Sequence, residues 1–307
     1  MNEWASLVHD ALAAGTILSL GGLGLLVNER VGVINLGAEG LMLIGAVTGY
    51  ATAVNTQSAW LAFGAGALTA AVLAAAFGWL VVWLNANQYA TGLAVTLFGG
   101  GFSAFVGVGY VGRKLEIPLN HSIPGLSEIP FLGTALFRQH PAFYASVVLC
   151  LFLSWLVWHT RTGLVLRAVG ESPESAHALG YRVRWIRLAA VVAGGALCGV
   201  AGTFLSVGYT PLWVEGMVAG RGWIALALTV FATWRPGRLL LGAYIFGGVN
   251  VLQLQLQAKG LHVLPAQFMN MLPYLATIVV LVLISRKPVW IRLNMPASLG
   301  KPFYPTQ

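Results

Sequence analysis

Long apolar segments recur along the whole chain of 307 residues, and they restrict its fold more than any other feature. A helix that crosses a lipid bilayer needs about 20 consecutive, mostly apolar residues. Segments of this kind lie at 4–27, 33–54, 60–84, 91–111, 142–159, 188–207, 223–234, 239–256 and 270–284. The sequence therefore predicts an all-α, polytopic transmembrane helical bundle with about nine spans. The range is eight to ten, because the second segment is interrupted by polar residues and the seventh is short.

The composition agrees with a lipid environment. Only 8% of the residues are charged and 58% are hydrophobic, whereas about a quarter of the residues in a soluble chain are charged. A folded protein of this size could not hide so much apolar surface from water. We expect residues 1–307 to form a single transmembrane domain in contact with the lipid bilayer.

Basic residues are gathered in particular gaps between the apolar segments, and this pattern predicts the orientation. Gaps that are rich in Lys and Arg remain in the cytoplasm. The gap at 160–187 holds five arginines, which are Arg161, Arg167, Arg182, Arg184 and Arg187. With nine spans, the N-terminus is then outside and the C-terminus is cytoplasmic. The same placement accounts for the net charge of +8, so no nucleic-acid partner is expected.

Motifs for catalysis and for metal binding are missing from the sequence. Asp10 is the single aspartate, which excludes a protease with paired aspartates. Cys150 and Cys198 lie singly within apolar segments, without the spacing of metal ligands. No phosphate-binding loop is present, so the chain is not expected to hydrolyse ATP by itself. We predict that it is not an enzyme and uses no cofactor or metal.

Polar residues inside apolar segments are candidates for a solute pathway, because a polar group in hydrocarbon is costly. Glu39 is the clearest, and Gly37 and Gly40 beside it favour an interrupted helix that faces a cavity. Alternatively, Glu39 lies near the cytoplasmic end and pairs with Arg30. Amides and hydroxyls among the candidates favour a neutral solute. The predicted pathway residues are Asn35, Glu39, Gln88, Thr91, Glu215 and Asn250.

A short helix is predicted within the gap at 160–187. Ser172 is a good N-cap, Pro173 suits the first helical position, and Gly180 ends the helix. A helix of about two turns is unstable alone in water, so it must dock onto its own spans or onto a cytoplasmic partner. The residues concerned are Glu171, Ser172, Pro173, Glu174, Ser175, Ala176, His177, Ala178, Leu179 and Gly180.

Four stretches of this chain resemble the permease subunits of bacterial ATP-binding-cassette (ABC) importers for simple sugars and nucleosides. This group also includes the permeases for branched-chain amino acids. The stretches are residues 27–40, 88–94, 162–171 and 220–227, in the order found in the family. The run at 28–40, Asn-Glu-Arg-Val-Gly-Val-Ile-Asn-Leu-Gly-Ala-Glu-Gly, is most similar to the nucleoside (purine) permeases.

The resemblance implies a complex in the bacterial cell (inner) membrane. Its other parts would be cytoplasmic ATP-binding subunits, a second permease subunit that is usually a different chain, and an external substrate-binding lipoprotein. Residues 160–187 would be the cytoplasmic coupling loop, with the helix at 173–179 inserted into a groove of the ATPase. The chain would translocate a nucleoside or simple sugar by alternating access. The alternative is an ion-coupled secondary transporter that uses Glu39 as the ion site.

Overall fold

The computed structural model describes residues 3–115, 125–258 and 294–304, together with 271, 275, 278, 279 and 282. Its regular elements in these ranges are helices, without a strand, and the predicted all-α class is confirmed. The helices are α1 (Glu3–Arg30), α2 (Ala38–Thr56), α3 (Ala59–Val82), α4 (Gln88–Gly107), η1 (Val108–Tyr110), α5 (Leu132–Leu136), α6 (Pro141–His159), α7 (Arg161–Glu171), α8 (Pro173–Ala178), α9 (Val183–Thr203), the π-helical turn η2 (Phe204–Tyr209), α10 (Arg221–Phe231) and α11 (Pro236–Ala258).

Six helices of the described chain are long and apolar enough to cross a membrane: α1, α3, α4 with η1, α6, α9 with η2, and α11. The predicted count of nine spans is therefore not confirmed. The second expected span is α2, which has 19 residues and carries Glu39 in its first turn. The seventh is α10, whose 11 residues extend about 16 Å and cannot cross about 30 Å of hydrocarbon. Most of the ninth, at 270–284, lies outside the described residues.

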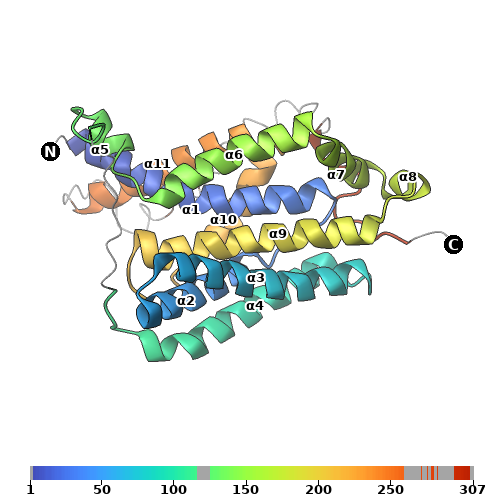
Figure 1. The fold of residues 1–307 in the computed structure, drawn as a ribbon, viewed down its shortest axis with the longest axis horizontal. Helices are drawn as coiled ribbons and strands as arrows, with labels where there is room; N and C mark the ends of the chain where they lie inside the picture. Colours follow the sequence, from blue (N-terminus) through green and yellow to red (C-terminus); the bar gives the residue numbers. More distant parts are fainter. Residues whose placement is uncertain are drawn as a thin grey trace.

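Helix α1 occupies the centre of the bundle. Its residues from Ala14 to Leu26 are buried without interruption, as expected for a helix that is apolar on every side. It packs against α9, α10 and α11, while α2 packs against α3, α4 and α9. Figure 1 shows α1 and α9 running side by side along the molecule, with α2, α3 and α4 below them and α6 above them.

Small residues allow these helices to approach closely. A Cβ atom added to Gly45 in α2 would lie 2.4 Å from the carbonyl oxygen of Gly199 in α9. The hydroxyl of Thr203 donates to the Gly45 carbonyl at 3.0 Å, and Ser206 donates to the Ala46 carbonyl at 2.8 Å. Close backbone contact and hydrogen bonds between helices replace the hydrophobic driving force that is missing in lipid.

Two helices begin well inside the bundle instead of at its end. Helix α2 starts at Ala38, after an irregular segment at 31–37, and α10 starts at Arg221, after an irregular segment at 210–220. The first segment lies against α4, because Cβ atoms on Gly37 and Gly92 would clash with Val95 and Leu36 respectively. The helix interruption expected around Glu39 therefore lies just before this residue, which itself belongs to α2.

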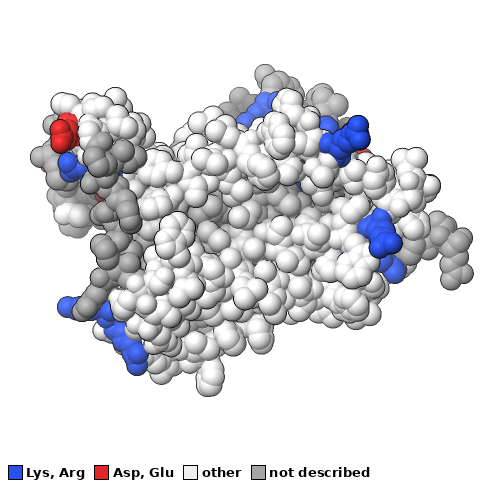
Figure 2. Space-filling model, in the orientation of Figure 1, with Lys and Arg blue, Asp and Glu red and all other residues white. Residues whose placement is uncertain are grey.

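Charged side chains on the visible face lie mainly toward the two ends of the molecule and at its upper edge, and the broad surface below that edge is uncharged (Figure 2). The start of α1 lies at one end, and the helices α7 and α8 and the described C-terminal segment lie at the other (Figure 1). An uncharged band between two charged ends is what a bilayer requires of the surface that it covers.

The contact between α2 and α4 supplies a matched pair of variants. A Cβ atom on Gly99 would lie 2.4 Å from the Cα of Gly40, whereas a Cβ on Gly100 meets nothing within 4 Å. We expect Gly99→Ala to destabilise the protein by about 1–3 kcal/mol through overpacking. Gly100→Ala should leave the melting temperature of the detergent-purified protein unchanged or slightly raised, and equal melting of the two variants would contradict the packing described here.

Candidate functional site

The carboxylate of Glu39 binds the N-terminus of α10. Its Oε1 accepts a hydrogen bond from the backbone N–H of Gly220 at 2.7 Å, and its Oε2 accepts one from Gly222 at 2.8 Å. Gly220 is the N-cap residue of α10 and has a φ of 82°, so a side chain there would be strained. A Cβ on Gly222 would lie 2.6 Å from the Cα of Glu39. Both glycines therefore allow this close approach.

This arrangement stabilises the negative charge inside the bundle. The first N–H groups of a helix have no partner within the helix, and the helix dipole makes this end positive. Glu39 also lies in the first turn of α2, so it is close to the positive ends of two helices. Its side chain is only 8% exposed, and hydrogen bonds to a carboxylate are about twice as strong as neutral ones. Glu39 thus fixes the start of α10 to the start of α2.

Glu39 does not pair with Arg30, which was the alternative expected from the sequence. The guanidinium of Arg30 donates to the backbone carbonyls of Trp234 and Asn294 and lies over the ring of Trp158. The short separation of Glu39 and Arg30 in sequence is misleading, because Arg30 ends α1 whereas the chain re-enters the bundle before Glu39.

A second buried carboxylate holds the other end of α10. Glu29, near the end of α1, accepts hydrogen bonds from the hydroxyl of Thr229 and the indole N–H of Trp234. Its side chain is 2% exposed, and Trp234 is also buried. Glu29 and Glu39 therefore hold opposite ends of the same short helix. Sequence reasoning missed Glu29, although it belongs to the same run, 28–40, as Glu39.

Two of the predicted pathway residues position the segment before α2. The Asn35 side chain accepts a hydrogen bond from the Gly37 N–H at 2.9 Å, and Gln88 Oε1 accepts one from the Ile34 N–H at 2.8 Å. Both side chains are buried. Asn35, Glu39 and Gln88 therefore belong to one connected region. The amide nitrogen of Asn35 is buried without a hydrogen-bond partner, so one polar group in the segment before α2 is unsatisfied.

The other three predicted pathway residues are placed differently. Thr91 is half-buried, and its hydroxyl donates to the Asn87 carbonyl in its own helix. Glu215 is exposed in the irregular segment before α10, and Asn250 is half-buried on α11. No described contact joins these three residues to Glu39. Nor do the described residues contain a cluster of His, Cys, Asp and Glu suited to a metal ion.

The short helix predicted in the Arg-rich gap is confirmed as α8. Ser172 is its N-cap and accepts from the Ser175 N–H at 3.3 Å, Pro173 occupies the first turn, and Gly180 has a φ of 87° after the helix. Pro173 and Ala176 are buried against the protein. The opposite face is open, with exposed side chains at Glu174, Ser175, His177, Ala178 and Leu179, and Glu171 at the end of α7 is exposed as well.

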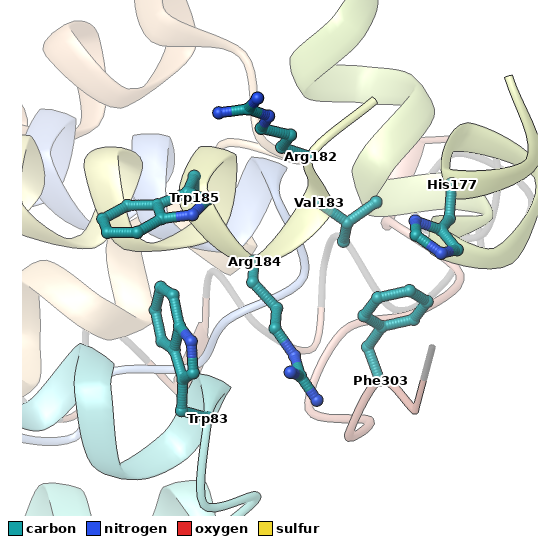
Figure 3. Close-up of a pocket in the computed structure, with 7 residues that line it drawn as sticks. All are labelled: Trp83, His177, Arg182, Val183, Arg184, Trp185 and Phe303. Atoms are coloured by element: carbon teal, nitrogen blue, oxygen red, sulfur yellow. The ribbon is translucent and has the colours of Figure 1, made fainter. Parts of the chain in front are cut away.

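A cavity of about 320 Å³ lies beside α8. Figure 3 shows His177 of α8 facing Phe303 of the C-terminal segment, with Arg184 and Trp185 from the start of α9 and Trp83 from the end of α3 nearby. The His177 and Phe303 rings are 5.7 Å apart, and those of Trp83 and Trp185 are 5.1 Å apart. Aromatic and basic groups on a concave surface are typical of a protein contact site.

The C-terminal segment joins α8 to the rest of this end. The Ser298 N–H donates to the Gly170 carbonyl at 2.9 Å, and the Gly300 N–H donates to the Gly32 carbonyl at 3.1 Å. Arg187, which is buried at the start of α9, donates to the Ser298 hydroxyl at 3.0 Å. One segment therefore contacts α7, α8, α9 and the residues that lead to Glu39.

Comparisons with known proteins agree with a transport role. Residues 7–284 match the family described as branched-chain amino acid transport system / permease component. The chain is 39% identical to a putative glucose ABC transporter permease protein, TsgC13, of Haloferax volcanii, over 97% of each chain. It is 32% identical to the nucleoside ABC transporter permease protein NupC of Lactococcus lactis, over 94% of this chain and 95% of that one.

A further relative is the guanosine ABC transporter permease protein NupQ of Bacillus subtilis, which is 32% identical over 90% of each chain. No solved structure matches this chain significantly. The family resemblance found in the sequence is therefore confirmed, and it covers sugar as well as nucleoside permeases.

Replacing Glu39 by Gln tests its role as the anchor of α10. The amide retains one acceptor oxygen, but its NH₂ group would face a backbone N–H of Gly220 or Gly222. We expect a loss of stability on the order of 2 kcal/mol, since hydrogen bonds to a charged group are lost, and a matching loss of transport. The melting temperature of the purified protein measures the first effect. Glu215→Gln is the matched control, because the Glu215 side chain is exposed, and equal effects of the two changes would refute the anchor.

Proposed function

The chain belongs to the branched-chain amino acid transport system / permease component family, and we propose that it is the membrane-spanning subunit of an ABC importer for a nucleoside or simple sugar. The observation that carries the proposal is near full-length similarity to permeases named for glucose, nucleosides and guanosine. Members of such a family are transport proteins and not enzymes, and the six long apolar helices suit a multi-pass membrane protein.

The partners follow from this assignment. The chain has no phosphate-binding loop, so ATP hydrolysis requires separate cytoplasmic ATP-binding subunits. A second permease chain would complete the pathway, and an external binding lipoprotein would deliver the solute and select it. Residues 1–307 then act as one transmembrane domain in the cell membrane, with the N-terminus outside and the Arg-rich end in the cytoplasm.

Helix α8, within the loop 160–187, is proposed as the element that the ATPase moves. Its buried residues, Pro173 and Ala176, attach it to the bundle, and Leu179 at its end is 78% exposed. The cavity in Figure 3 opens beside this helix and gives the partner a concave surface. The contact with the ATPase therefore depends on the exposed face, whereas Pro173 and Ala176 transmit its movement to the permease.

A continuous set of contacts connects α8 with Glu39. His177 packs against Phe303, and the same segment binds Gly32 through Gly300. The residues after Gly32 bind Gln88 and lead directly into the first turn of α2, where Glu39 holds α10. We propose that displacement of α8 shifts the starts of α2 and α10 together, and that this shift opens and closes the pathway.

The occupied N-terminus of α10 supports a neutral solute. A helix N-terminus inside a transporter can bind an anionic substrate, but here Glu39 already accepts from two of the first N–H groups, those of Gly220 and Gly222. The same contacts favour a structural role for Glu39 over a proton or sodium site, because its carboxylate already receives two hydrogen bonds from the start of α10. Nucleosides and simple sugars carry no negative charge that would need this helix N-terminus.

Uptake measurements test the class of transporter. With radiolabelled nucleoside and radiolabelled hexose offered in parallel, cells with the intact system should accumulate one of them. Loss of the cognate ATPase should reduce this uptake to background, because the permease has no energy source of its own. Uptake that continues without the ATPase, and that collapses when the ion gradient is removed, would instead establish the secondary transporter.

The exposed face of α8 can be tested separately. We expect Leu179→Ser to reduce substrate-stimulated ATP hydrolysis by the reconstituted transporter at least about tenfold, as loss of a buried contact of about 1.4 kcal/mol would. Leu164→Ser is the control, because Leu164 is also exposed but lies on α7. Both variants should insert and remain folded. If Leu164→Ser reduces hydrolysis as much as Leu179→Ser does, α8 is not the specific coupling element.

A further inference from the structure

A second cavity, of about 540 Å³, lies between the end of α6 and the start of α11. Ser154 and Trp158 of α6 line it, together with Arg235, Arg238 and Leu241 at the start of α11. Each helix is long and apolar enough to span a bilayer, and the cavity lies where one ends and the other begins. This is the level at which hydrocarbon gives way to lipid headgroups.

Basic side chains line this cavity and lie next to it. Three guanidinium groups surround the ring of Trp158, with Cζ at 5.5 Å for Arg30, 4.9 Å for Arg167 and 5.7 Å for Arg235. Arg238 adds a fourth, and its Nη1 donates to the Thr233 hydroxyl at 2.8 Å. Glu171 is the carboxylate whose charge acts on Arg30. Arg235 and Arg238 line the cavity, and Arg30 and Arg167 lie around the same tryptophan ring, so the site favours an anion with several oxygen atoms.

Apolar surface continues from this basic cavity toward the middle of the membrane. Leu241, which lines the cavity, is 65% exposed, and Ile245 one turn further along α11 is 67% exposed. On α6, Trp155 and Leu151 are exposed and lie on the same side as Trp158 by their spacing of three and seven residues. A ligand that fits both features has an anionic head and a long apolar part.

We propose that this cavity binds the headgroup of an anionic phospholipid from the cytoplasmic leaflet, with the acyl chains along Leu241 and Ile245. The choice of the cytoplasmic leaflet rests on the proposed orientation of the permease. Basic pockets between membrane helices on the cytoplasmic side are suited to such headgroups, and Trp at the interface fits the same level. The lipid would fix α6 to α11 and to Arg30, which follows Glu29 directly in α1.

Lipid titration of the purified, delipidated transporter complex tests this site. Native mass spectrometry would compare phosphatidylglycerol with phosphatidylcholine of the same acyl chains. We expect tight binding of phosphatidylglycerol only. The double variant Arg235→Gln with Arg238→Gln should weaken it roughly 30-fold, since each basic residue at a membrane surface contributes about 1 kcal/mol. Arg235→Lys, which keeps the charge, should retain most of the binding and shows that the site still folds.

The control is Arg182→Gln with Arg184→Gln, which removes the same charge at the same end of the molecule with similar exposure. An equal loss of phosphatidylglycerol in both double variants would overturn the site, because binding would then depend on net charge alone. Competition by equimolar glycerol 3-phosphate would overturn the lipid in favour of a free anion. Loss of ATPase association with lipid binding intact would mark the cavity as a protein contact. None of these readouts depends on the transported solute, so they are separable from the proposed transport function.

Discussion

The carboxylate of Glu39 at the N-terminus of α10 is the interaction on which the centre of this structure depends. An isolated short helix inside a membrane protein leaves its first N–H groups without partners, and an isolated carboxylate there is equally unfavourable. The N–H groups of Gly220 and Gly222 donate to the Glu39 carboxylate at 2.7 and 2.8 Å, so the helix end and the carboxylate each gain a partner. Since Glu29 holds the far end of α10, a helix too short to span the bilayer is still fixed in position. Removing either carboxylate would therefore affect the position of the whole of α10, and not just one local contact.

The end of the molecule that carries α8 is connected to Glu39 through segments that are not helical (Figure 1). Residues 31–37 and 294–304 meet at Gly32 and Gly300, and the first of them leads into the helix that carries Glu39. The rigid elements are packed through small residues such as Gly45 and Gly199, so they move as bodies more readily than they deform. Irregular backbone is tolerated at this depth because Gln88 and Asn35 satisfy its polar groups. A permease of this design concentrates its adjustable parts in a few short stretches.

The long helices and the short helix α8 were predictable from the sequence. Apolar segments predicted the positions of the long helices, and Ser172, Pro173 and Gly180 predicted α8, because those signals are local. The partners of Glu39 were not predictable, since Gly220 and Gly222 are about 180 residues away and contribute only backbone. The backbone carbonyls of Trp234 and Asn294, which accept from Arg30, were not predictable either, because they too are distant in sequence and belong to the backbone. The segment 223–234 was a doubtful span only because it is short. It forms the 11-residue α10, and the sequence pattern could not distinguish such a helix from a truncated span.

The C-terminal segment has a consequence for biosynthesis. Residues 294–304 are synthesised after every helix that they contact, yet they supply partners for Arg30, Arg187 and the Gly32 carbonyl. The helices can enter the membrane one after another during translation, but Arg187 remains without the Ser298 hydroxyl until this segment has left the ribosome. The surface around α8 is therefore completed only after the helices that surround it. A nascent chain that still lacks residues 294–304 cannot present this surface in its finished form, so a partner that recognises the surface binds only after these residues have emerged.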